Sequence, residues 1–99
     1  MANTKSNILS GPRAKLIVSF DPNDTQSQAM IISLDKALGI LSGADRLDIT
    51  AISDRAMKQQ FDMMVPSIAI YKGGKLLGST TVKTDRGISN FLNKLKKEI

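Results

Sequence analysis

The pattern of hydrophobic and polar positions predicts strands that alternate with helices. Residues 15–20 (KLIVSF) form a nearly continuous apolar run rich in β-branched side chains, typical of a strand buried on both faces. Residues 25–41 repeat apolar side chains at helical spacing, and Gly43 is the expected stop. Ile31 and Ile32 widen this apolar stripe, so we expect a well-buried helix. Residues 46–52 (RLDITAI) alternate apolar and polar positions, which favours a partly exposed strand.

The second half of the chain predicts a short helix, a hairpin and a final helix. Ser53 is positioned to cap a helix over residues 54–61 that buries Met57 and Phe61. Residues 66–72 (PSIAIYK) and 75–81 (KLLGSTT) predict two strands, joined by a tight Gly-Gly turn in which both positions tolerate positive φ. The last helix, capped by Thr84 or Asp85, has a regular apolar stripe: Ile88, Phe91, Leu92, Leu95 and Ile99.

This order of elements, β-α-β-α-β-β-α, predicts an α/β fold with one four-stranded mixed sheet flanked by helices. The first two strands are expected to be parallel and linked by a right-handed crossover, and the hairpin makes the last two antiparallel. Residues 14–99 are long enough for one domain with a modest core. Residues 1–13 are polar and contain glycine and proline, so we expect a flexible basic N-terminal tail.

The absence of cysteine and histidine limits the catalytic and metal-binding chemistry that the chain can support. The chain has no cysteine and no histidine. Disulfides, thiol redox chemistry and a cysteine-and-histidine zinc site are therefore excluded, and the commonest general base near neutral pH is missing. The acidic and polar residues at 21, 23 and 24 lack the glycine and distal glutamate of a calcium loop, so we interpret them as turn and helix-capping residues. We expect no metal and no cofactor.

The net charge of +5 permits an anionic partner, including nucleic acid. Much of the excess positive charge lies on the C-terminal helix, at Lys94, Lys96 and Lys97. These lysines are also explained by an ordinary solvent-exposed helix face that binds no partner. Only 4% of the residues are aromatic, which gives poor support to a base-stacking surface. The N-terminal residues lack the apolar segment of a signal peptide, and no apolar run approaches the ~20 residues that span a bilayer. We therefore expect a cytoplasmic protein without a membrane contact.

Several segments resemble the thioredoxin-like superfamily. Residues 65–75 (VPSIAIYKGGK) resemble the thioredoxin segment in which Ile-Pro-Thr opens a strand that ends in Phe-Lys-Asn-Gly. Residues 15–20 resemble the strand before the thioredoxin active site, and residues 25–28 (TQSQ) fall where that family has Cys-Gly-Pro-Cys. Thr25 and Gln28 thus replace both cysteines, and Ser19 occupies the position of a buried aspartate. The resemblance implies a minimal thioredoxin-like fold in a redox-inactive member.

The resemblance also implies where a partner would bind. It implies a cis bond between Val65 and Pro66, and a residue before the proline that offers its backbone to an extended peptide. Of Met63 and Met64 we expect one to pack inward, while an exposed methionine would give an adaptable apolar contact. The alternative interpretation is that Pro66 only shapes the loop.

Thr25 has two further interpretations besides partner binding. The pattern Thr25 to Gln28 matches a capping box, in which the threonine hydroxyl caps the helix and the glutamine reaches back. The free amides of the helix end also suit a phosphate or carboxylate. Nucleophilic catalysis is disfavoured because no histidine is present to activate the hydroxyl.

These observations predict a non-catalytic, thioredoxin-like module that binds a protein partner as a scaffold, chaperone or assembly subunit. The expected partner-binding residues are Thr25, Gln26, Met64, Val65 and Pro66. The alternative is a nucleic-acid-associated accessory protein of a replication complex, including a viral one. A glutathione-dependent transferase is disfavoured because the chain lacks room for the second domain that such enzymes use.

Overall fold

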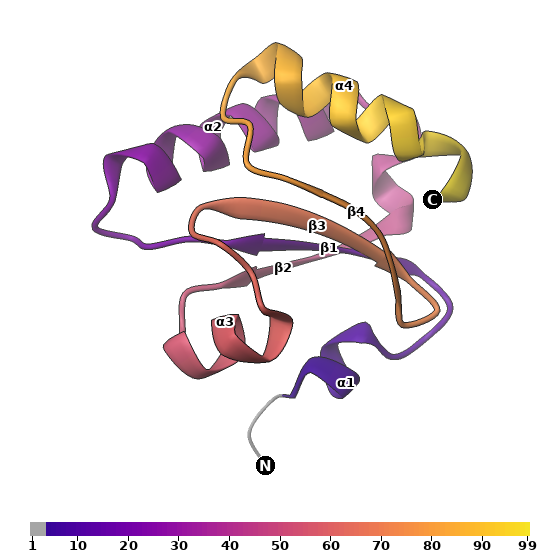
Figure 1. The fold of residues 1–99 in the computed structure, drawn as a ribbon. Coiled ribbons are helices and arrows are strands. Elements are labelled where there is room, and N and C mark those ends of the chain that lie inside the picture. Colours follow the sequence, from indigo (N-terminus) through magenta and orange to yellow (C-terminus); the bar gives the residue numbers. More distant parts are fainter. Residues whose placement is uncertain (1–3) are drawn as a thin grey trace.

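The computed structural model describes residues 4–99. Four strands form one sheet in the order β2-β1-β3-β4, with α2 and α4 on one side and α1 and α3 on the other (Figure 1). The elements follow the chain as α1 Lys5–Leu9, β1 Ala14–Ser19, α2 Thr25–Ile40, η1 Ala44–Arg46, β2 Leu47–Ile52, α3 Arg55–Phe61, β3 Ser67–Lys72, β4 Lys75–Thr80, α4 Asp85–Leu95 and η2 Lys96–Glu98.

The sheet has the predicted mixed topology. Strand β1 pairs parallel with β2 and antiparallel with β3, and β3 pairs antiparallel with β4. The turn between β3 and β4 uses Gly73 and Gly74 at φ values of 61° and 78°, which only glycine adopts readily. The four-stranded mixed sheet predicted from the sequence is confirmed.

Strand β1 divides the core into two layers because its side chains alternate across the sheet. All six of its residues are buried, as expected for a central strand covered on both faces. Leu16 and Val18 join the larger core beneath α2 and α4, while Ile17 joins the smaller core beneath α1 and α3. The smaller core consists of Leu9, Ile17, Ile52, Phe61, Ala69 and Tyr71.

Helix α2 is less buried than its composition predicts. Met30, Leu34 and Ala37 form its buried stripe against the sheet and α4. Ile32 lies outside that stripe and is 57% exposed, and Ile31 is only partly buried. An outer-layer helix has one covered face, so the expectation that both isoleucines widen the buried surface is wrong for Ile32.

The N-terminal segment is not a loose tail throughout. The hydroxyl of Thr4 accepts a hydrogen bond from the Asn7 amide at 3.2 Å and caps α1. Leu9 is only 7% exposed because it covers the smaller core. The prediction of a flexible tail over residues 1–13 is therefore wrong for residues 5–9, and residues 1–3 lie outside the described part of the chain. The apolar pair Ile8 and Leu9 was the signal that sequence reasoning missed.

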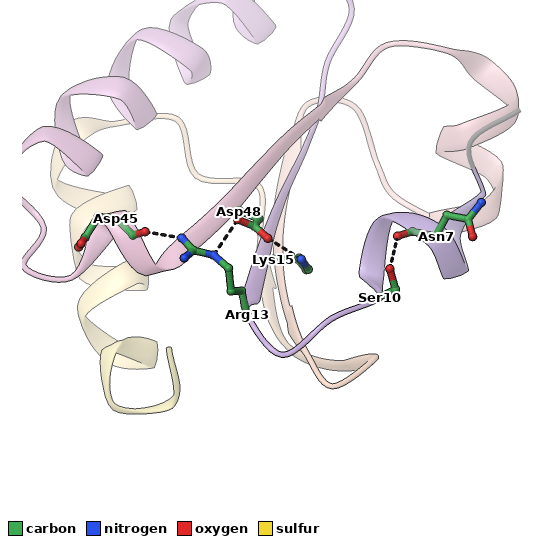
Figure 2. A network of polar contacts seen from close by, with 6 residues as sticks. All are labelled: Asn7, Ser10, Arg13, Lys15, Asp45 and Asp48. Carbon is green, nitrogen blue, oxygen red and sulfur yellow. Dashed lines mark hydrogen bonds and ion pairs between the residues drawn. The ribbon is translucent and has the colours of Figure 1, made fainter.

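A charged network links the first residues around β1 to the start of β2 (Figure 2). Arg13 Nε lies 2.8 Å from Asp48 Oδ1, and Lys15 Nζ lies 2.5 Å from Asp48 Oδ2. Arg13 also donates a hydrogen bond to the Asp45 carbonyl. Asp48 thus joins the start of β1 to the start of β2, its parallel neighbour.

Candidate functional site

Both predicted binding segments lie at one end of the sheet. The pairing of Ser19 with Ser67 places the end of β1 beside the start of β3. Thr25 and Gln26 open α2 shortly after β1, and residues 64–66 precede β3 directly. The topology therefore brings these two segments, which are far apart in sequence, to the same edge of the domain.

The start of α2 is capped by Asp24, one of the residues interpreted from the sequence as turn and helix-capping residues, and not by Thr25. The carboxylate of Asp24 accepts hydrogen bonds from the amide and the hydroxyl of Ser27, both at 3.1 Å. The Gln28 side chain donates to the Pro22 carbonyl at 3.0 Å instead of reaching back to Thr25. The predicted capping box at Thr25 is wrong, because the carboxylate one residue earlier takes the cap position.

This cap changes what the helix end can bind. The Asp24 carboxylate accepts from the Ser27 amide at the start of α2, so a phosphate or carboxylate ligand there would meet its negative charge. Thr25 and Gln26 are exposed, and neither side chain forms a hydrogen bond to any described residue. Their side chains are free to contact a partner but have no catalytic group to activate them.

The loop before β3 is held in place from both sides. Helix α3 ends at Phe61, and the next residue, Asp62, adopts a left-handed conformation with φ of 51°. The Ser67 hydroxyl donates to the Met64 carbonyl at 2.6 Å. Pro66 is buried, and the peptide bond between Val65 and Pro66 is cis.

Two residues of this loop face outward. Met64 is 70% exposed and Val65 is 43% exposed. Neither the N–H nor the C=O of Val65 forms a backbone hydrogen bond within residues 4–99. Met63 packs instead against the smaller core, so one of the two methionines does turn inward. An extended segment would find an unpaired backbone group beside exposed apolar side chains here.

A groove of about 440 Å³ continues from this loop towards β4. Phe61 and Tyr71 contribute aromatic rings that pack edge to face, with centroids 5.8 Å apart. Burial raises the pKa of the Tyr71 hydroxyl above its ordinary value of 10.0. Of the five predicted binding residues only Met64 lines the groove, which is bounded by Phe61, Asp62, Met63, Met64, Ser67, Ala69, Tyr71, Leu76, Ser79, Thr80 and Thr81.

Comparison with solved structures establishes the fold. The chain superposes on Trxlp from Edwardsiella tarda with a TM-score of 0.75 at 14% identity, covering 88% of each chain. A Malassezia sympodialis thioredoxin gives 0.75 at 9% identity, covering 90% of this chain and 80% of that one. Mitochondrial thioredoxin 3 from Saccharomyces cerevisiae gives 0.73 at 12% identity, covering 90% and 85%. The chain has a thioredoxin-like fold.

The likeness lies in the structure and not in the sequence. No protein-family model and no curated protein matches the chain at the sequence level. Within the thioredoxin-like fold, the resemblance places the redox cysteines at residues 25 and 28, and the chain contains none. Thiol–disulfide exchange between two cysteines of this chain is therefore impossible.

Ser19 supplies no acidic group at the end of β1. Its side chain is fully buried at the end of β1, opposite Ser67. Its hydroxyl is the one buried side-chain polar atom among residues 4–99 that lacks a hydrogen-bond partner. The resemblance places a proton-transferring aspartate here, and a serine hydroxyl does not ionise near neutral pH. Among these residues no group of three or more acidic residues is placed to hold a metal ion.

Sequence reasoning also missed a contact to Phe61 and Tyr71, the two aromatic residues that line the groove. The Lys5 ammonium lies 5.6 Å from the ring centroids of both Phe61 and Tyr71. The Lys5 amide donates to Gln60 Oε1 at 2.9 Å, which fixes α1 against α3. Cation–π contacts of this kind depend on tertiary packing, so no sequence pattern signals them.

Proposed function

We propose that this domain is a non-catalytic protein-binding module that acts as a scaffold, chaperone or assembly subunit. The observation that carries the proposal is Val65, whose backbone N–H and C=O are unpaired within the described residues while its side chain is 43% exposed. The hydrogen bond from the Ser67 hydroxyl to the Met64 carbonyl holds the loop that contains Val65, which lowers the conformational entropy that this loop would lose on binding.

A partner would bind as an extended segment. Its backbone pairs with Val65, as in strand addition, and its side chains meet the exposed Met64 and the groove beyond it. Methionine suits such a contact because its flexible thioether adapts to different apolar shapes. Thr25 and Gln26 contribute polar contacts from the start of α2.

The proposal that the domain is not an enzyme rests on missing chemistry. The chain has neither cysteine nor histidine, and the hydroxyl of Thr25 has no base to activate it. Ser19 supplies no acidic group at the end of β1. We propose the cytoplasm as the location. No helix within residues 4–99 combines the length and apolar character that crossing a bilayer demands.

The proposal is tested by quantitative affinity capture and mass spectrometry with three forms of the domain. Val65→Asp places a charge on the proposed pairing residue, and Ile49→Asp is the matched control on the edge strand β2, where Ile49 is 50% exposed. One specific partner should be recovered with the wild type and the control and be lost with Val65→Asp. Equal recovery of every protein by all three forms would contradict the proposal.

Thr25→Asp tests the second half of the proposed surface. Its charge adds to that of Asp24 at the start of α2, so a partner that contacts both segments should bind more weakly. Retention of the partner by Thr25→Asp together with its loss by Val65→Asp would restrict the site to the loop before β3.

A further inference from the structure

The net positive charge of the domain lies at one end of the sheet. The starts of β1 and β2, the turn between β3 and β4 and the end of α4 all meet at that end (Figure 1). Of the 14 Lys and Arg residues eight lie there, against three of the 9 Asp and Glu residues, which leaves a surplus of five. The eight are Arg13, Lys15, Arg46, Lys72, Lys75, Lys94, Lys96 and Lys97.

The rest of the domain is electrically balanced. Six cations and six carboxylates remain, and they cancel, so the whole formal charge of +5 belongs to the cationic end. The loop around Val65 and Pro66 lies at the opposite end, because it precedes β3 while the β3–β4 turn follows it. A surface with one sign of charge attracts an oppositely charged partner over a distance of about one Debye length, 8–10 Å.

A cleft of about 490 Å³ at this end gathers three of the cations. Arg46 from η1 and Lys96 and Lys97 from η2 line it, together with Ser42, Gly43 and Ile99. No carboxylate of residues 4–99 lies within ion-pair distance of any of these three cations. The three charges are thus available to a ligand, whereas Arg13 and Lys15 are already paired with Asp48.

Arg46 lies beside Gly43 in the cleft. Gly43 has a φ of 86°, a conformation that favours glycine, and a β-carbon built there would be in ordinary van der Waals contact with the guanidinium carbon of Arg46, at 3.8 Å. The Arg46 side chain is exposed and forms no ion pair with any described residue. Its planar guanidinium offers donors that match the oxygens of a phosphate.

We propose that the cationic end binds the phosphate backbone of nucleic acid without reading its sequence. The cations are spread over four segments, which suits a row of phosphates better than one small anion. Among residues 4–99, Ile99 is the only large apolar residue that lines the cleft, so its described lining lacks the apolar core of a protein interface. No aromatic side chain of the described residues lines it, so it offers bases no stacking surface there and the contact is made to phosphates.

The test is fluorescence anisotropy with a short labelled DNA duplex over a series of salt concentrations. If the three cleft cations neutralise three phosphates, affinity should fall about 40-fold between 50 and 200 mM salt. The combined variant Arg46→Gln, Lys96→Gln and Lys97→Gln should bind much more weakly and lose about three from the log–log salt slope. These side chains are exposed, so the fold should be retained.

A charge-matched control removes three exposed cations elsewhere. The combined variant Lys36→Gln, Arg55→Gln and Arg86→Gln lowers the net charge equally but should keep most of the affinity and the salt slope. No binding at low salt, an equal loss in both triple variants, or equally tight competition by polyglutamate would overturn the proposal. Val65→Asp should leave DNA binding unchanged. The proposed DNA-binding site and the proposed protein-binding site are therefore tested independently of each other.

Discussion

Lys15 Nζ lies 2.5 Å from Asp48 Oδ2 and places a buried ammonium against a carboxylate on the neighbouring strand (Figure 2). The hydrogen bond from Lys15 lowers the pKa of Asp48, partial burial opposes this shift, and the charges of Lys15 and Arg13 reinforce it. A carboxyl with a lowered pKa stabilises the fold when it is ionised and loses that contribution as pH falls through its pKa in the folded state.

Asp48→Asn should therefore destabilise the domain near pH 7. The difference from wild type should begin to shrink as the pH falls below about 4, where the carboxyl of the unfolded chain becomes protonated, and should be lost once the folded carboxyl with its lowered pKa is protonated too. Urea denaturation over a pH series measures this. If the difference in the free energy of unfolding between the two proteins stays constant down to pH 2, the charge of the Asp48 carboxylate is not the source of the stabilisation.

Asp24→Ala should reduce the free energy of unfolding by about 1 kcal/mol, because it removes the cap from the longest helix. Thr25→Ala is the matched control one residue later and should change it by only a few tenths of a kcal/mol. Chemical denaturation distinguishes the two variants. A larger loss of unfolding free energy in Thr25→Ala than in Asp24→Ala would show that Thr25 is the capping residue.

Leu9→Ala should cost about 2 kcal/mol, since it exposes the smaller core that α1 covers. Ser6→Ala, on an exposed position of the same helix, should be nearly neutral. Thermal unfolding of both variants tests whether α1 belongs to the cooperative unit. If Leu9→Ala matches wild type, α1 does not stabilise the fold.

Ser19→Ala should leave stability unchanged or raise it by up to about 1 kcal/mol, because the buried hydroxyl has no hydrogen-bond partner among the described residues. Ser67→Ala, its neighbour on β3, should instead destabilise by about 1 kcal/mol because it removes the bond to the Met64 carbonyl. Urea denaturation of both variants measures the two changes in the free energy of unfolding. Equal destabilisation by both substitutions would contradict the conclusion that only the Ser67 hydroxyl has a hydrogen-bond partner.

The periodic parts of the fold were predictable from sequence because their signals are local. The apolar run of β1, the stripe of α4 and the Gly73-Gly74 turn each specify an element without reference to the rest of the chain. Helix α1 was missed because five residues carry too little periodicity, and its stability comes from the core that it covers.

The site was less predictable than the fold, because competition between neighbouring residues decides its details. Asp24 and Thr25 are both good capping residues, and only the loop geometry shows that Asp24 takes the cap. The exposure of Met64 and the unpaired backbone of Val65 depend on how the loop leaves α3. The cationic end arises from topology, which brings together lysines that are distant in sequence.

The most direct test of the proposed binding function is an amide NMR titration of the labelled domain with the segment of the captured partner that binds it. The account predicts that the signals of Val65 and Ser67 shift first and furthest, with Met64 beside them. In Val65→Asp the shifts at this loop should vanish. A saturating titration in which the loop signals stay unchanged would contradict the proposed site.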